Sequence, residues 1–163
     1  IEKARQNAQK GQFENVEFRL GEIEKIPVAN DEVDVVISNC VINLSPDKER
    51  VFKEAFRVLK PGGRLMVSDM VLLKELPAAI RQSVEAYVGC IAGAAMKGDY
   101  LAAIEAAGFR DIETVGEEFY PIELMTGDPI AQEMCAELQL SGEAVKDLSN
   151  SVASIKVSAV KPN

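Results

Sequence analysis

The segment VDVVISNCVINL, residues 33–44, contains the residues best suited to chemistry, because the amide of Asn39 and the thiol of Cys40 directly follow an apolar run. Residues 33–38 are apolar on both faces of an extended chain, which is typical of a strand inside a parallel sheet. In such sheets, ligands bind beyond the carboxyl ends of the strands. Cys40 is therefore expected to lie at a ligand crevice.

Two other predicted strands end in a similar way. Residues 16–22, VEFRLGE, read as a strand that ends at Gly21 and Glu22, with Ile23 next. Residues 64–69, RLMVSD, form another apolar strand, which ends at Ser68 and Asp69, with Met70 next. Three such ends in succession favour a binding site over three unrelated polar loops. Acids at strand ends are common, so the aspartate of the third end is not counted as a site residue.

The available side chains restrict the chemistry. The chain has no histidine, so a reaction must use carboxylates, thiols or a nucleophile that needs no base. Its three cysteines are widely spaced and do not read as a disulfide framework, which indicates a reducing, cytoplasmic setting. A cysteine outside a disulfide is most often a small buried apolar residue. That alternative stands for Cys40 and Cys90, and core packing is the interpretation of Cys135.

Composition indicates one globular domain over residues 1–163, with 47% hydrophobic and 27% charged residues. The net charge of -8 argues against nucleic acid or an anionic membrane surface as a partner. No apolar run reaches the ~18 residues that a membrane span requires.

Periodicity and turn residues predict an alternation of strands and helices, and so an α/β fold with helices on both faces of the sheet. The helix that follows Cys40 starts at Ser45 and Pro46, a hydroxyl cap and a first-turn proline. The other predicted elements are helices at 1–10, 78–96, 98–107 and 129–140 and strands at 110–119 and 155–161.

The run FRVLKPGGRLMVSD resembles the helix–loop–strand unit of class I S-adenosylmethionine-dependent methyltransferases. The segments FRLGEIEKIPV, DVVISNCVINLSPDKERVFKEAFRVLKPGGRL and EAYVGCIAGA together resemble arsenite methyltransferases, from Ile1 to about Phe119. The resemblance implies a Rossmann-like sheet, mostly parallel with an antiparallel final strand. It also implies S-adenosyl-L-methionine as cofactor and a small-molecule substrate, arsenite or its thiol conjugate.

The same resemblance assigns roles to particular residues. It implies that Cys40 and Cys90 are thiols that bind trivalent arsenic, close enough to share one atom. It places Gly21, Glu22 and Ile23 beside the adenine of the cofactor and Asn39 beside its sulfonium end. Trivalent arsenic is soft and thiophilic, and its lone pair can displace a methyl group without loss of a proton. The lack of histidine is then no obstacle.

Some parts of the family pattern are not found in this chain. The sequence opens inside a helix, and the glycine-rich motif, the acidic end of the second strand and a third arsenic-binding cysteine are absent. We therefore expect strands 1 and 2 of the sheet to be missing, and the chain to be inactive or very weak. Two rival hypotheses remain: a methyltransferase for a quinone or small metabolite, with Asp69 or Glu22 as base, and a non-catalytic fragment that self-associates.

The missing strands lead to a prediction about the sheet. In the superfamily the strands lie in the order 3-2-1-4-5-7-6, so residues 33–38 would become an apolar edge. An unpaired apolar edge is a template for another strand. We expect residues 16–22 to move over and pair there, or a second copy of the chain to form a dimer through this edge. The order 4-5-7-6 should persist in either case.

Overall fold

The computed structural model describes residues 1–76, 93–119, 132, 136, 141–142 and 150–163. The predicted helix at 129–140 and most of that at 78–96 lie outside these residues, as do Cys90 and Cys135. The described elements, in chain order, are α1 (Glu2–Lys10), β1 (Val33–Asn39), η1 (Ile42–Leu44), α2 (Lys48–Val58), β2 (Leu59–Leu72), α5 (Lys97–Ala106), β3 (Arg110–Phe119) and β4 (Val152–Val160).

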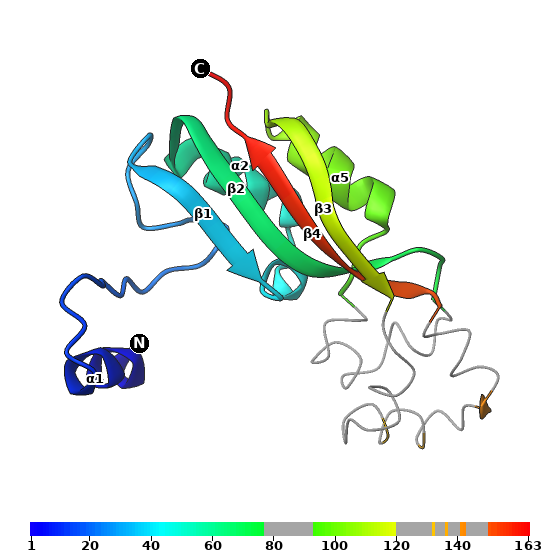
Figure 1. Ribbon diagram of the computed structural model, residues 1–163, viewed down its shortest axis with the longest axis horizontal. Helices are drawn as coiled ribbons and strands as arrows, with labels where there is room; N and C mark the ends of the chain where they lie inside the picture. The colour runs from blue at the N-terminus through cyan, green and yellow to red at the C-terminus, as the bar shows by residue number, and fades with distance from the viewer. Residues whose placement is uncertain (77–92, 120–131, 133–135, 137–140, 143–149) are drawn as a thin grey trace.

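The four strands form one sheet in the order β1-β2-β4-β3, which confirms the predicted order (Figure 1). Strands β1 and β2 are parallel, and Asn39 lies opposite Ser68 near their carboxyl ends. Strand β4 is antiparallel to both β2 and β3, as predicted for the last strand of the chain. The carboxyl ends of β1 and β2 therefore meet at one edge of the sheet.

Helices α2 and α5 lie on the same face of the sheet and pack against each other (Figure 1). The rings of Phe52 in α2 and Tyr100 in α5 meet edge to face, with their centroids 5.2 Å apart. Such aromatic pairs add stability beyond the apolar area that they bury. The core between helices and sheet includes Val51, Ala55, Leu65, Val67, Val71, Ile104, Phe109, Ile155 and Val157.

The start of α2 differs slightly from the prediction. The helix begins at Lys48, and its cap is Asp47, whose side chain accepts a hydrogen bond from the backbone N–H of Arg50 at 3.0 Å. Ser45 lies two residues before this cap, and its hydroxyl accepts a hydrogen bond from the backbone N–H of Asp47 at 3.1 Å. The loop before α2 thus carries two successive side-chain caps, and a carboxylate suits the helix N-terminus better.

The prediction of a strand at residues 16–22 was wrong. This segment has no regular secondary structure, and the side chain of Leu20 is 81% exposed. The side chain of Arg19 instead pairs with Glu17 and donates to the backbone oxygen of Pro27. An alternating pattern forms a stable strand only where a neighbouring strand supplies hydrogen bonds, and no described strand pairs with this segment.

Strand β1 is an edge strand of the described sheet, as predicted from the missing strands. Its core-facing Val36 packs in the hydrophobic cluster, whereas Ile37 is 77% exposed. Ile37 lies opposite Met66 of β2, which is also exposed. Among the described residues this second face is not covered by a helix, because α1 buries none of its side chains. Of the two outcomes expected for this edge, pairing with residues 16–22 was wrong, and pairing with a second copy of the chain stays a prediction.

Candidate functional site

Cys40 lies where the carboxyl end of β1 meets that of β2, as the sequence predicted. Its backbone N–H donates to the carbonyl oxygen of Ser68 at 2.9 Å, and its side chain is exposed. The residue has a φ of 54°, in the left-handed region that side chains other than glycine rarely adopt. This conformation turns the chain sharply out of the strand and into η1.

Two of the four predicted cofactor residues share one groove. Ile23 and Asn39 both line a hollow of about 330 Å³ that runs along β1 to its carboxyl end. Gly21 and Glu22 lie in the adjoining loop and are not among its lining residues. A side chain at Gly21 would come within 2.7 Å of the Pro27 ring, so the tight loop itself requires glycine there. The other residues that line the groove are Ile26, Val36, Ile37, Ser38, Val41, Ile42, Val51, Ala55 and Leu65.

A buried carboxyl group lies next to this strand end. Asp69 of β2 is 0% exposed, and its Oδ2 accepts a hydrogen bond from the hydroxyl of Tyr100 at 2.7 Å. Burial raises the pKa of Asp69 from 3.8 to about 6, although the Tyr100 hydrogen bond and the charge of Lys48 act in the opposite direction. Burial, with the neighbouring Asp69, also raises the pKa of Tyr100.

The charge of Asp69 acts on other groups around the strand end. Partial burial and then the Asp69 charge raise the pKa of the Cys40 thiol above its usual value of 9.0. The thiol is therefore protonated at neutral pH. Burial lowers the pKa of the Lys48 ammonium, against the effect of Asp69. The Nζ of Lys48 donates to the backbone oxygens of Asn43 and Ser45, at 3.3 and 3.1 Å.

A polar contact connects the groove loop to the loop that carries Cys40. The hydroxyl of Ser45 donates to the Oε1 of Glu24, the residue after Ile23. The guanidinium of Arg50 donates to the backbone oxygen of Glu24 at 3.0 Å. The position of Ile23 is thus linked to that of the thiol loop through side chains of the α2 start.

Sequence reasoning missed several residues of this cluster. Asp69 was visible as an acid at a strand end but was left out, because nothing in the sequence shows that it is fully buried. Tyr100 was recognisable only as part of a helix, since its contact with Asp69 joins residues 31 positions apart. Lys48 and Asn43 gave no signal beyond their position near Cys40.

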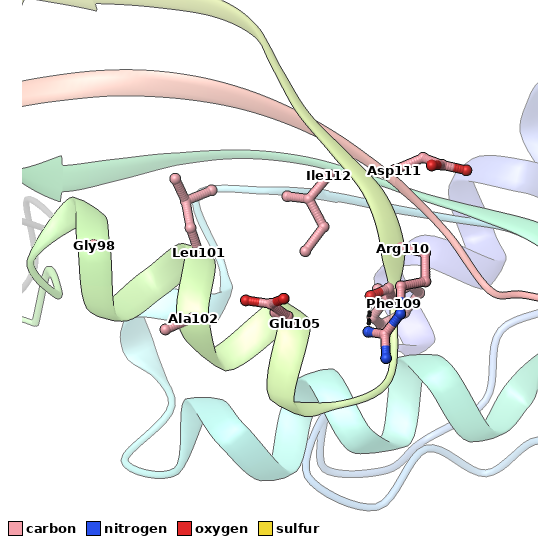
Figure 2. A pocket seen from close by; sticks show the side chains of 8 residues that line it. All are labelled: Gly98, Leu101, Ala102, Glu105, Phe109, Arg110, Asp111 and Ile112. Carbon is pink, nitrogen blue, oxygen red and sulfur yellow. Dashed lines mark hydrogen bonds between the residues drawn. The ribbon is translucent and has the colours of Figure 1, made fainter.

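A larger hollow, of about 480 Å³, lies between α5 and β3 (Figure 2). Figure 2 shows the carboxylate of Glu105 on α5 and the guanidinium of Arg110 at the start of β3 beside it. Arg110 pairs with Val160, which in turn pairs with Arg64 near the beginning of β2. The Arg110 end of this hollow is therefore at the opposite end of the strands from Cys40 and Asp69, and its lining residues include no cysteine.

The described residues contain neither a membrane-spanning helix nor a group of side chains that could hold a metal ion. No helix among them is long and apolar enough to cross a membrane. No three of their His, Cys, Asp and Glu side chains cluster as a metal site requires. Cys90 lies outside the described residues, so the predicted meeting of Cys40 and Cys90 stays a prediction.

An open α/β sheet with a polar cluster and a groove at the carboxyl ends of its parallel strands is the arrangement of a ligand-binding Rossmann-like domain. Residues 1–108 match the family described as a methyltransferase domain, and the chain belongs to that family. The predicted Rossmann-like methyltransferase fold is thereby confirmed.

Curated relatives narrow the resemblance to arsenite methyltransferases. The chain is 50% identical over 113 residues to an arsenite methyltransferase of Halobacterium salinarum, an alignment that covers 69% of this chain and 29% of that protein. It is 41% identical over 115 residues to that of Aquipseudomonas alcaligenes, covering 69% of this chain and 33% of the relative. The chain thus spans about a third of the length of these relatives. The predicted family resemblance is confirmed.

Solved structures agree with this assignment. An arsenic(III) S-adenosylmethionine methyltransferase from Chlamydomonas reinhardtii superimposes with a TM-score of 0.59 at 30% identity, covering 88% of this chain and 42% of that one. The protein YcgJ from Bacillus subtilis gives a TM-score of 0.71 at 18% identity, over 100% of this chain and 78% of the other. At that identity the second likeness shows the fold alone.

Proposed function

We propose that this chain is the thiol-bearing part of an S-adenosylmethionine-dependent methyltransferase that acts on trivalent arsenic. The observation that carries the proposal is the position of Cys40, beside Asn39 at the carboxyl end of β1, in a chain 50% identical to an arsenite methyltransferase. A parallel strand end is where such sheets bind ligands. A sulfur atom at this position supports the proposal, because it would lie close to a substrate bound beyond the strand end.

The groove along β1 fits one part of the cofactor. Its lining is mostly apolar, with Ile23 and Ile42 available to contact a flat ring such as adenine. Asn39, at the end of the groove nearest Cys40, would lie toward the sulfonium end, and Gly21 and Glu22 would flank the ring from the adjoining loop. When bound, the cofactor supplies an electrophilic methyl group. Among the described residues that line the groove, none carries a carboxylate that could accept from the ribose hydroxyls.

The proposed substrate binds through ligand exchange at Cys40. Because the thiol is protonated at neutral pH, it brings its own proton to the exchange. With trihydroxyarsenic, the S–H and one As–O bond break, an S–As bond forms, and the proton leaves with the hydroxide as water. Cys90 is proposed as a second sulfur ligand. This chemistry needs no histidine.

Protection against alkylation tests the proposal. The alkylation rates of Cys40, Cys90 and Cys135 with iodoacetamide are followed by mass spectrometry, with and without arsenite. We expect arsenite to slow alkylation of Cys40 and Cys90 but not of Cys135. Cys40→Ser and Cys90→Ser should each weaken arsenite binding, and Cys135→Ser is the matched control. Unchanged rates at Cys40 and Cys90 would instead support a methyltransferase for another small molecule, in which Cys40 is incidental.

A further inference from the structure

Two buried oxygen atoms near Cys40 have no hydrogen-bond partner in the part of the chain that the structure describes: Oδ1 of Asn43 and Oδ1 of Asp69. Asn43 is 1% exposed and Asp69 is 0% exposed, so water does not satisfy either atom from the surface. A buried polar atom without a partner costs about 1–3 kcal/mol. Two such atoms at one strand end require an explanation. A bound ligand that donates hydrogen bonds to them would remove this cost.

The orientation of both groups is fixed by their other contacts. The amide nitrogen of Asn43 donates to the backbone oxygen of Met70 at 2.7 Å, and only the nitrogen can make this bond. The remaining atom of that amide must therefore be an acceptor. The Oδ2 of Asp69 is occupied by the Tyr100 hydroxyl. Both unsatisfied atoms are thus hydrogen-bond acceptors, and both are buried.

The charges around these atoms limit what can bind. The ammonium group of Lys48 lies near enough to Asp69 to alter its ionisation, and it is held by the backbone oxygens of Asn43 and Ser45. A second cation here would be repelled by Lys48. A neutral ligand that carries hydroxyl groups is not repelled and can donate to both oxygens. The cluster therefore favours a neutral donor over a metal ion.

We propose that Asn43 Oδ1 and Asp69 Oδ1 form an acceptor subsite for the hydroxyl groups of a trivalent arsenic oxyacid bound at Cys40. The inference rests on the proposed function and adds to it a preference for the hydroxylated form of the substrate. Trihydroxyarsenic is neutral at neutral pH; it keeps two hydroxyl groups after Cys40 displaces one, and one hydroxyl group after Cys90 displaces a second. Dimethylarsinous acid keeps none, because its single hydroxyl leaves when the sulfur binds.

Access to the subsite requires a small movement of η1. Asn43 lies in this single turn, whose neighbours Val41 and Leu44 are 44% and 42% exposed. Loops that bind ligands commonly shift when the ligand enters. A shift of this turn, which follows Cys40 closely in the chain, would move Asn43 and expose the two acceptors while Asp69 stays on β2.

The test compares two arsenicals on the same protein. The concentration that half-protects Cys40 from iodoacetamide is measured for arsenite and for dimethylarsinous acid, and their ratio is the readout. Asp69→Asn keeps an acceptor for Tyr100 but replaces the unsatisfied oxygen with an NH₂ donor. Asn43→Ala removes the other acceptor. General loosening of the thiol loop changes both concentrations alike and cancels in the ratio.

We expect each variant to raise the half-protecting arsenite concentration about tenfold, the effect of one lost hydrogen bond, and to leave that of dimethylarsinous acid nearly unchanged. Tyr100→Phe is the control, because it removes the neighbouring hydroxyl and leaves both acceptors in place, so its ratio should stay at the wild-type value. An unchanged ratio in both Asp69→Asn and Asn43→Ala would overturn the subsite while leaving the proposed function intact. A wild-type Cys40 that neither arsenical protects would overturn the proposed function, and the subsite with it.

Discussion

Asp69 makes the unfolding free energy of the domain depend on pH. Its carboxyl group is fully buried, and its pKa rises from 3.8 to about 6 on folding. Below pH 3.8 the carboxyl group is protonated in both the folded and the unfolded chain, and its contribution to the unfolding free energy is fully present. Between 3.8 and about 6 the unfolded chain releases the proton that the folded chain retains. The unfolding free energy should therefore fall as pH rises through this window.

The size of the effect follows from the two pKa values. One unit of difference between folded and unfolded chains corresponds to about 1.4 kcal/mol, so the change from 3.8 to about 6 amounts to about 3 kcal/mol. No discount for solvent screening applies, because Asp69 is 0% exposed. This is a large part of the ~5–15 kcal/mol that stabilises a typical domain.

Asp69→Asn provides the comparison. Asparagine has the same shape, still accepts from Tyr100, and does not titrate. Urea unfolding is measured by circular dichroism from about pH 3.5 to pH 7 for both proteins. Other groups contribute to the wild-type curve; Glu54, whose pKa is lowered chiefly by its hydrogen bond with Arg57, acts with the opposite sign. These contributions cancel when the variant is subtracted.

The wild-type minus variant difference should fall by about 3 kcal/mol across this range. A difference that stays flat, or that grows with pH, would show that Asp69 is ionised in the folded protein at low pH. The account of its burial would then be refuted.

Three further predictions concern the cofactor, the sheet edge and the loop contact. S-adenosylmethionine should bind this chain far more weakly than an intact methyltransferase, since each lost hydrogen bond to a charged group removes about 1.5–3 kcal/mol; micromolar binding in calorimetry would contradict this. The chain should self-associate through β1, and Ile37→Lys should shift light scattering toward monomer, with Val115→Lys on β3 as control, since Val115 is 56% exposed against 77% for Ile37. Ser45→Ala should raise hydrogen exchange at residues 23–26 and leave α5 unchanged, because it removes the bond to Glu24.

The sequence correctly predicted the strands that are buried between two neighbouring strands. Strands β2 and β4 were found because each is buried and has a neighbour on both sides. Residues 16–22 carry a strand pattern of the same quality, yet they form no strand. The pattern records which side chains prefer burial, but the hydrogen bonds of a strand come from a neighbour that the pattern does not specify.

In the candidate site, too, the residues set by local features were predicted, and those set by long-range packing were not. Asn39 and Cys40 were found because a strand end is a local feature, and their position in the sheet follows from the strand alone. Asp69 shares that local feature but differs in burial, which depends on α5 bringing Tyr100 onto β2. Its raised pKa and its unsatisfied oxygen are consequences of that long-range packing. No window of sequence around Asp69 contains them.

The proposed exchange of arsenic ligands at Cys40 does not require a general base. Partial burial, and then the nearby carboxylate, raise the pKa of the Cys40 thiol, which lowers its thiolate fraction and makes it a poorer nucleophile toward ordinary electrophiles. Ligand exchange on arsenic tolerates this, because the departing hydroxide takes the proton. The same arrangement would hinder a reaction that needs a preformed thiolate. The electrostatics around Cys40 therefore favour a role as ligand over a role as covalent nucleophile, and Cys40 alkylation should be slow at neutral pH and accelerate only as pH approaches the raised pKa.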